Sequence, residues 1–305
     1  MQKTLKNPSL NNAYCGRFAP SPSGKLHFGS LVTALASYLD AKFNQGRWLV
    51  RIEDLDPPRE EAGASKAILS SLEAHHLHWD GEVVYQSHRY DLYENHLELL
   101  TKKSRTFRCN CTRQRLQELD NRYDGYCLRH PPPTQSPSAI KFVPERSEIV
   151  AINDLIQGRL ETVVSNPEDV FVLKRKDNLY AYQLAVVCDD IEQGISHIVR
   201  GCDLLSTTAN QILLYQSFNT IAPTFGHLPV VLGDNQQKLS KQNKAKPIND
   251  QHALKNIHQA LDFLRQEPPD IKELNSVEEL LRWAVKHWAL NKIPQQEGMM
   301  FEPIL

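Results

Sequence analysis

The sequence predicts an α/β protein built on a doubly wound parallel sheet. Short apolar runs typical of strands alternate along the chain with longer segments in which apolar residues recur at helical spacing. This order is typical of parallel sheets whose two faces are covered by helices. Apolar residues make up 41% of the chain and charged residues 23%, as in ordinary globular proteins, and 305 residues are enough for about two domains.

The first section, from residue 13 to about 104, shows this order most clearly. A short apolar run that stops at Pro20 predicts a strand, and the Ser-Pro-Ser-Gly segment at 21–24 predicts a loop. Apolar residues between Leu26 and Lys42 recur at helical spacing and predict a helix. The same reasoning predicts a second strand and two further helices, around residues 47–52, 68–72 and 90–100.

The later sections are less regular. Residues 105–135 end in three consecutive prolines and predict an insertion with its own small core or metal site, and residues 140–175 are β-rich. Residues 180–218 are expected to form a strand and then a helix, LPVVLG at 228–233 another strand, and 250–290 helices. We therefore expect two halves of an α/β core separated by the insertion and followed by a short helical C-terminal region, with the four parts at residues 1–104, 105–175, 176–246 and 247–305.

The composition excludes several classes of protein. No run of about 18 uncharged apolar residues is present, so we expect no membrane span, and the first residues lack the apolar core of a secretory signal. Six cysteines are too few for a disulfide scaffold, so we expect a cytoplasmic protein. A formal net charge of −1 argues against a protein that coats nucleic acid without specificity.

The segment APSPSGKLHFGSL, residues 19–31, is a candidate phosphate site. Small residues and glycines ahead of a predicted helix leave backbone N–H groups available, and the positive end of the helix dipole attracts anions. His27 lies in the first turn, where its ring can donate a hydrogen bond to a phosphate oxygen. A proline-rich turn with an ordinary helix cap is the competing interpretation, and the Gly-x4-Gly-Lys-Ser/Thr signature of P-loops is absent.

A lysine-rich loop is the second candidate. It has four lysines in nine positions and no acidic residue, at Lys238, Lys241, Lys244 and Lys246. Mobile ammonium groups suit the charge that develops on a leaving pyrophosphate. Taken alone, however, such a run indicates a solvated surface loop.

Side chains at the ends of predicted strands form a third group, made up of Arg17, Glu53, Tyr182 and Arg200. In open α/β sheets, ligands bind beyond the carboxyl ends of the strands, so these positions are candidates by location. Each guanidinium group can bind a carboxylate, and Glu53 can bind an ammonium group. Any one of these residues alone would indicate a surface ion pair.

Three cysteines fall within a short stretch of the predicted insertion, at positions 109, 111 and 127. Thiolates bind zinc well, and structural zinc sites need four ligands. By spacing, the fourth is His130, Asp124 or Tyr123, and the usual ligand chemistry favours the histidine. Three unrelated thiols are the competing interpretation. The other cysteines lie in apolar, strand-like surroundings and are expected to pack in the core, at positions 15, 188 and 202.

The phosphate segment and the lysine loop together resemble the paired signatures of class I aminoacyl-tRNA synthetases. His27-Phe28-Gly29-Ser30 stands at the "HIGH" place and Lys238-Leu239-Ser240-Lys241-Gln242 at the "KMSKS" place, with Ser30 and Gln242 departing from the two signatures. The segments RFAPSPSG, RIEDLD, YQLAVVCDD and RGCDLL resemble the glutamyl branch. The length and the cysteine pattern further resemble the glutamyl-Q tRNA(Asp) synthetases, a family of short relatives of glutamyl-tRNA synthetase, over about residues 13–290.

The resemblance implies a Rossmann-like catalytic core that uses ATP, with magnesium, to convert L-glutamate into glutamyl-adenylate and pyrophosphate. His27 and Lys241 would be the catalytic residues, because they would stabilise charge on the phosphates. ATP would contact residues of both signatures, namely His27, Gly29, Lys238, Ser240 and Lys241. One arginine would bind each carboxylate of glutamate and Glu53 its amino group, within a site formed by Arg17, Phe18, Ala19, Pro20, Ser21, Glu53, Tyr182 and Arg200.

The resemblance also implies one structural zinc ion per chain, in a lobe near the acceptor nucleotide. Its ligands by the family pattern are Cys109, Cys111, Tyr123 and Cys127. The resemblance therefore favours Tyr123 as the fourth ligand, whereas spacing alone favours His130.

The acceptor follows from the family and from the length of the chain. Only residues 242–305 follow Lys241, so we expect no separate anticodon-binding domain. In the family this goes with transfer of glutamate to the queuosine base in the anticodon loop of tRNA(Asp), carried out by a monomer. Two other functions stay open: a truncated glutamyl-tRNA synthetase that charges a terminal adenosine, and a non-catalytic, zinc-containing module that binds nucleotide or RNA.

Overall fold

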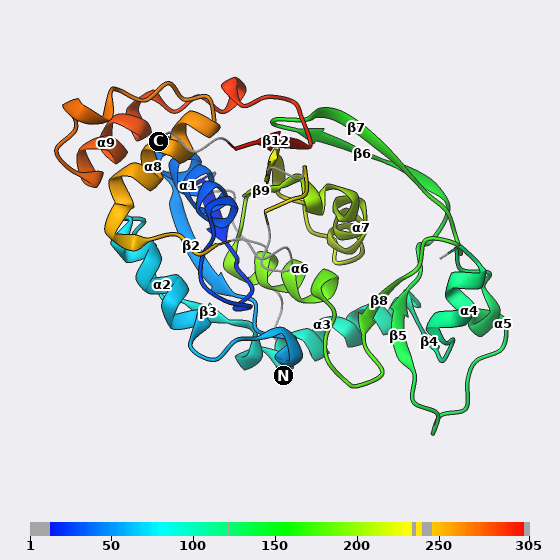
Figure 1. Ribbon diagram of the computed structural model, residues 1–305. Coiled ribbons are helices and arrows are strands. Elements are labelled where there is room, and N and C mark those ends of the chain that lie inside the picture. Colours follow the sequence, from blue (N-terminus) through cyan, green and yellow to red (C-terminus); the bar gives the residue numbers. More distant parts are fainter. Residues whose placement is uncertain (1–12, 121, 234–235, 240–245, 302–305) are drawn as a thin grey trace.

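A computed structural model describes residues 13–120, 122–233, 236–239 and 246–301 of the chain. A parallel-stranded body carries the helices α8 (Ala253–Phe263) and α9 (Val277–His287) at one end. An antiparallel lobe lies at the other end (Figure 1). None of the described helices is long and apolar enough to cross a membrane.

The body is built on short parallel strands. One group contains β1 (Cys15–Phe18), β2 (Arg47–Ile52) and β3 (Val84–Tyr85), with β2 in the middle. A second parallel pair is formed by β9 (His197–Gly201) and β10 (Thr224–Leu228). The two groups lie side by side, because the Ser196 N–H donates to the Cys15 carbonyl at 2.9 Å.

Helices cover both faces of these strands. Along β2, Trp48 and Val50 pack into one apolar core and Leu49 into another, as expected when alternate side chains of a strand point to opposite faces. The first core contains α8 and α9 together with α1 (Phe28–Phe43) and α2 (Ala64–Ala74). The second contains α3 (Tyr90–Lys102), α6 (Tyr182–Gln193) and α7 (Thr208–Ser217). The predicted α/β class, with parallel strands between two helical layers, is confirmed.

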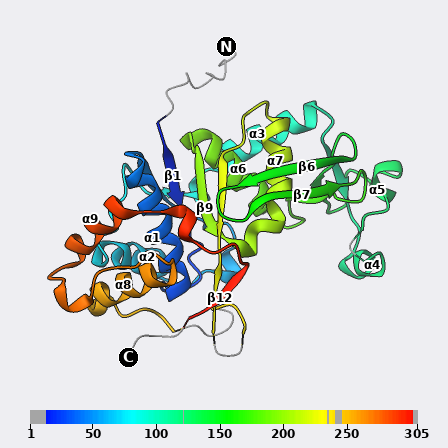
Figure 2. The same ribbon diagram turned by 90° about the horizontal axis from the view of Figure 1, so that it is seen from above.

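The lobe corresponds to the segment that the sequence predicts as an insertion. Its antiparallel sheet consists of β4 (Thr106–Cys109), β5 (Ala139–Phe142) and β8 (Phe171–Lys174), flanked by the short helices α4 (Arg113–Glu118) and α5 (Tyr126–Arg129). A long hairpin, β6 (Glu148–Asp154) and β7 (Gly158–Val164), runs from the lobe back to the body, as Figures 1 and 2 show. There the Leu155 N–H donates to the Phe225 carbonyl at 2.8 Å.

The final strand pair returns the chain to the body. β11 (Val230–Leu232) lies parallel to β12 (Gly298–Met300), and the Val230 N–H donates to the Glu297 carbonyl at 2.8 Å. β11 confirms the strand predicted from LPVVLG, whereas the sequence reasoning did not find β10 just before it.

One predicted segment is wrong. Residues 180–218 were expected to be a strand followed by a helix, but they form α6, then β9, then α7. Cys188, expected in strand-like surroundings, lies in α6, although it is buried as predicted. The run from Leu184 to Asp190 is buried at every position, so no polar face marks a helical period, and its adjacent valines are typical of strands.

Candidate active site

A cavity of about 600 Å³ opens at the carboxyl ends of β1, β2 and β9. It is large enough for a small-molecule ligand. The cavity is lined by every residue predicted for glutamate and by three of those predicted for ATP: Arg17, Phe18, Ala19, Pro20, Ser21, Glu53, Tyr182, Arg200, His27, Gly29 and Lys238. The predicted Ser240 and Lys241 lie outside the described residues. Segments far apart in sequence therefore meet at one site.

His27 caps the N-terminus of α1 at the edge of this cavity. Its ring Nδ1 accepts a hydrogen bond from the Ser30 N–H at 3.3 Å, and Nε2 lies 3.0 Å from the Ser30 hydroxyl. Gly29 allows this ring position, because a Cβ there would meet the ring of His27 at 3.2 Å. The helix N-terminus, with its oriented N–H groups, thus faces the cavity as an anion site requires.

Lys238 comes from a distant part of the sequence, after β11, and lines the same cavity as His27. Its ammonium group pairs with the Asp203 carboxylate, and both side chains are partly exposed. A surface pair of this kind is weak, so Lys238 can be drawn to a bound phosphate at little cost.

Arg200 is almost fully buried at the end of β9, and its three shortest hydrogen bonds go to neutral groups. Nε donates to His227 at 3.0 Å, Nη1 to Gln211 at 2.8 Å and Nη2 to Thr208 at 2.8 Å. A longer contact of 3.3 Å joins Nη1 to the Tyr182 hydroxyl. No described carboxylate lies within ion-pair distance of Arg200, and burial lowers its pKa. This guanidinium is therefore fixed in position while its charge is left for a ligand.

Arg17, the second predicted guanidinium, is placed differently. Its Nε and Nη2 donate to the two oxygens of Asp190 at 3.2 and 3.3 Å. Asp190 also accepts from Arg51 at 2.9 Å, and Arg51 is entirely buried. Burial alone would raise the pKa of Asp190, but Arg17 and Arg51 outweigh it and lower that pKa. The two predicted arginines are thus not equivalent, since Arg17 already has a carboxylate partner.

Glu53 follows β2 and faces this network. Its Oε1 is buried and accepts no hydrogen bond from the described residues. The same oxygen forms an ion pair with Arg51, whose Nη2 lies 3.5 Å away. Burial raises the pKa of Glu53 to about 7, although Arg51 and Arg17 act in the opposite direction. The Glu53 side chain lines the cavity, where a carboxylate is suited to binding an ammonium group.

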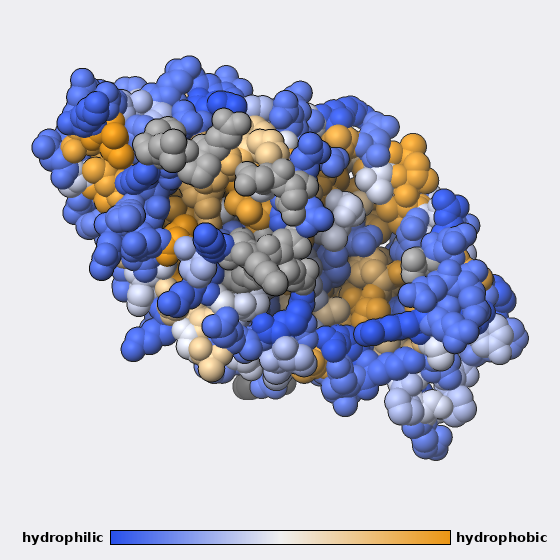
Figure 3. Space-filling view, in the orientation of Figure 1, coloured by the Kyte–Doolittle hydropathy of each residue, from blue (hydrophilic) through white to orange (hydrophobic). Residues whose placement is uncertain are grey.

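A second cavity, of about 910 Å³, adjoins the first and shares Ser21, Ser23, Glu53 and Tyr182 with it. Three arginines from separate segments line it, at positions 59, 113 and 175. The molecular surface is hollowed between the body and the lobe, with apolar side chains at the base of the hollow (Figure 3). The small-molecule site is therefore continuous with a larger recess, which the acidic residues Glu53, Asp56 and Glu60 also line.

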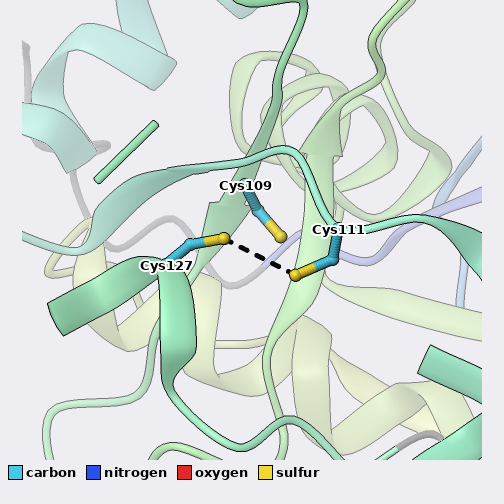
Figure 4. A group of neighbouring side chains, drawn as sticks. All are labelled: Cys109, Cys111 and Cys127. Atoms are coloured by element: carbon cyan, nitrogen blue, oxygen red, sulfur yellow. Dashed lines mark hydrogen bonds between the residues drawn. The ribbon is translucent and has the colours of Figure 1, made fainter. Parts of the chain in front are cut away.

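In the lobe, the three cysteines point toward one another from β4, from the loop after it and from α5 (Figure 4). The Sγ atoms of Cys109, Cys111 and Cys127 all lie within 4.8 Å of one another, and those of Cys111 and Cys127 are 3.5 Å apart. Two thiolates on a tetrahedral zinc ion lie about 3.8 Å apart, given Zn–S bonds of about 2.3 Å. The cluster therefore has the dimensions of a metal site.

The candidates for a fourth ligand are also placed. Tyr123 is buried, and its hydroxyl accepts a hydrogen bond from the Cys127 N–H at 2.6 Å, so it lies next to the thiols. His130 is instead exposed and lies against the ring of Tyr126, and Asp124 pairs with Arg115. The geometry thus favours Tyr123 over the histidine that spacing favours.

The comparisons with known proteins agree with this site. The family described as "tRNA synthetases class I (E and Q), catalytic domain" matches residues 15–266. The chain belongs to this family. Curated relatives named glutamyl-Q tRNA(Asp) synthetase, from Serratia proteamaculans and Vibrio cholerae, are 47% and 44% identical to it, with 95% of each chain covered in both cases.

A solved structure of a glutamate tRNA ligase shares the fold of this class I synthetase. The chain superposes on a glutamate tRNA ligase from Elizabethkingia meningosepticum, solved in complex with its amino acid, with a TM-score of 0.80 and 27% identity. The match covers 95% of the synthetase and 67% of that ligase.

Sequence reasoning missed several residues that support the site of the synthetase, namely Arg51, Asp189, Asp190, Gln211 and His227. One signal was available, because Asp189 and Asp190 directly follow a continuous apolar run in YQLAVVCDD. Two adjacent carboxylates beside so apolar a segment indicate buried ion pairs, which these residues form with Arg17, Arg51 and Arg89.

Proposed function

We propose that this synthetase activates L-glutamate with ATP and transfers the glutamyl group to the queuosine base in the anticodon loop of tRNA(Asp). The activation step is supported by the cavity, by the glutamate tRNA ligase that shares the fold and by the names of the relatives. The acceptor is supported by the names of relatives whose chains are covered almost completely. The observation that carries the proposal is that Arg200, which has no carboxylate partner among the described residues, lines the same cavity as Glu53.

The charges of the site fit an acidic amino acid. Arg17, Arg51 and Arg89 pair with buried aspartates of α6, whereas no described carboxylate lies within ion-pair distance of Arg200. The side-chain carboxylate of glutamate would supply that partner, and its ammonium group would bind the Glu53 carboxylate. Each charge-assisted hydrogen bond of this kind contributes about 1.5–3 kcal/mol.

Glutamine would be rejected by the same arrangement. Its amide cannot compensate the charge of Arg200, and a buried, desolvated guanidinium would stay without a counterion. A site built to bind a polar group discriminates strongly against an analogue that leaves that group unpaired.

The chemistry places the phosphates at the start of α1. An oxygen of the glutamate α-carboxylate attacks the α-phosphorus of ATP, a new P–O bond forms, and the bond to the bridging oxygen breaks, which releases pyrophosphate. The negative charge that develops on the phosphate oxygens would be stabilised by the helix N-terminus, by the His27–Ser30 pair and by Lys238. The catalytic role predicted for Lys241 belongs to the same step, but this residue lies outside the described residues.

The cysteine cluster would hold one structural zinc ion. Cys109, Cys111 and Cys127 supply three thiolates, and the buried Tyr123 hydroxyl is the nearest fourth donor among the candidates. Zinc bound there would tie β4 to α5 and stabilise the lobe. The ion would lie away from the glutamate cavity and would take no part in the activation step.

The second cavity provides room for the acceptor. It opens directly onto Glu53 and Tyr182, so a base placed there would bring its hydroxyl groups to the activated carboxyl group. RNA loops can present an unstacked base to a protein pocket. Arg113 makes no ion pair with the described residues and would supply positive charge for an adjoining phosphate, whereas Arg59 and Arg175 pair with Asp56.

Two assays test the proposal. Glutamate-dependent exchange of pyrophosphate into ATP measures activation, and its absence would favour a non-catalytic nucleotide- or RNA-binding module. Transfer of labelled glutamate to tRNA(Asp) with and without queuosine measures the acceptor. We expect labelling only of the queuosine-containing RNA. Equal labelling of both RNAs, or labelling of tRNA(Glu) at its terminal adenosine, would support the truncated glutamyl-tRNA synthetase instead.

A further inference from the structure

A buried chain of hydrogen bonds connects the hairpin of the lobe to the glutamate cavity. It runs from Asp154, the last residue of β6, through His227 on β10 to Arg200 on β9. The three side chains are all buried, and His227 is entirely inaccessible to solvent. His227 Nδ1 lies 2.6 Å from Oδ2 of Asp154, and Arg200 Nε donates to His227 Nε2 at 3.0 Å.

The partners of the ring define its tautomer. Arg200 has only donors, so His227 Nε2 must accept, and the ring proton must therefore lie on Nδ1. Asp154 accepts that proton with Oδ2. Its other oxygen, Oδ1, accepts the backbone N–H groups of Ile156, Gln157 and His227, at 3.0, 2.9 and 3.1 Å. The carboxylate is thus oriented by the turn of the hairpin and cannot rotate without losing three hydrogen bonds.

This arrangement suits a guanidinium that must bind an anionic ligand. A carboxylate in place of His227 would hold Arg200 equally well but would neutralise its charge, as Asp190 does for Arg17. A neutral imidazole fixes the plane of Arg200 together with Gln211 and Thr208 and leaves the charge available. The hydrogen bond from Asp154 keeps the imidazole in the one tautomer that can accept from Arg200.

We propose that His227, held in its Nδ1–H tautomer by Asp154, is a positioning residue that orients Arg200 for the side-chain carboxylate of the substrate. This inference rests on the proposed function, which assigns that carboxylate to Arg200. It also gives the hairpin of the lobe a part in amino-acid binding, since the hairpin supplies Asp154.

The substitution Asp154→Asn tests the proposal because it reverses the tautomer without removing the turn. The amide oxygen must take the place of Oδ1, where three backbone N–H groups point, so the amide NH2 group then faces His227 Nδ1. The ring proton moves to Nε2, and two donors face each other at the contact with Arg200. In a catalytic triad, a carboxylate-to-amide change that reverses the tautomer of the histidine in this way strongly lowers kcat. We expect the KM for glutamate in pyrophosphate exchange to rise about tenfold or more, with the KM for ATP unchanged.

The double variant separates positioning from a general loss of structure. In His227→Gln, the side-chain oxygen can accept from Arg200 and has no tautomer to invert, so adding Asp154→Asn to this background should change the glutamate KM less than about twofold. An equal rise in both backgrounds, or an unchanged glutamate KM in Asp154→Asn alone, would overturn the proposal.

A second measurement does not depend on activity, so it distinguishes failure of this inference from failure of the proposed function. The 15N chemical shifts of the His227 ring report directly which nitrogen carries the proton. We expect a protonated Nδ1 in the unchanged protein and a protonated Nε2 in Asp154→Asn. A protonated Nε2 in the unchanged protein would contradict the positioning role, whatever the enzyme activates.

Discussion

The substitution Glu53→Gln removes the carboxylate that we assign to the amino group of the substrate. The variant keeps the shape of the side chain and removes its negative charge. We expect it to weaken glutamate binding and to abolish a pH dependence that the unchanged enzyme shows between pH 6 and pH 8.

The size of that pH dependence follows from the environment of Glu53. Burial raises its pKa to about 7, against the opposing effect of Arg51 and Arg17, while Asp190 and Asp189 add to the rise. Only the ionised form can pair with an ammonium group. The ionised fraction is about one tenth at pH 6 and about nine tenths at pH 8, so kcat/KM for glutamate should rise about tenfold over this range.

The assay is glutamate-dependent pyrophosphate exchange at saturating ATP, measured across this pH range. The KM for ATP serves as the internal control, because Glu53 is not expected to contact the phosphates. In Glu53→Gln, kcat/KM for glutamate should be low and flat with pH. A variant that retains the tenfold rise, or that binds glutamate as well as the unchanged enzyme at pH 8, would refute the role of Glu53.

The raised pKa of Glu53 also leads us to expect an effect on the stability of the fold. The pKa of Glu53 is higher in the folded protein than in the unfolded chain, so the folded state favours the protonated form. Stability from this group is present at low pH and is lost as the pH rises from about 4.5 through 7. Glu53→Gln should therefore raise the free energy of unfolding at pH 8, by about 3 kcal/mol at most, in urea denaturation.

The remaining predictions concern the network, the metal and the phosphates. Asp190→Asn leaves Arg17 and Arg51 buried without their shared carboxylate and should lower the free energy of unfolding by about 3–5 kcal/mol. The control Glu98→Gln, at an exposed ion pair, should change the free energy of unfolding by less than about 0.5 kcal/mol. Similar values for both variants would contradict the buried network. Cys109→Ser should lower bound zinc well below one ion per chain by metal analysis while Cys15→Ala retains it, and full zinc in Cys109→Ser would show that the ligand set is wrong. His27→Ala should lower kcat of exchange about 10²-fold with little change in the glutamate KM, and a purely KM effect would argue against charge stabilisation on the phosphates.

Local sequence was sufficient for three of the elements that build the cavity, although not for β9, the strand that carries Arg200. The strand that ends in Arg17, the helix after His27 and the strand before Glu53 all follow from short apolar runs, helical spacing and the prolines that interrupt them. Their location at strand ends placed Arg17, Glu53 and Arg200 at one edge of the sheet, where the structure brings them into one cavity.

The supporting residues could not be found in this way. Arg51 and Asp190 are 139 residues apart, and His227 and Asp154 are 73 residues apart, so only the folded chain brings them together. The difference between Arg17 and Arg200 has the same origin, because one guanidinium meets a carboxylate of α6 and the other a histidine of β10. The helix α6 was not predicted because every residue from Leu184 to Cys188 is apolar, so this run shows no alternation of apolar and polar faces at helical spacing.

The most direct test of the site is a crystal structure with a non-hydrolysable analogue of glutamyl-adenylate. We expect one molecule in the cavity, with its side-chain carboxylate on Arg200, its amino group on the Glu53 carboxylate and its phosphate mimic at the start of α1. Binding of the analogue with its amino group away from Glu53, or with Arg200 still bonded only to protein groups, would contradict the account.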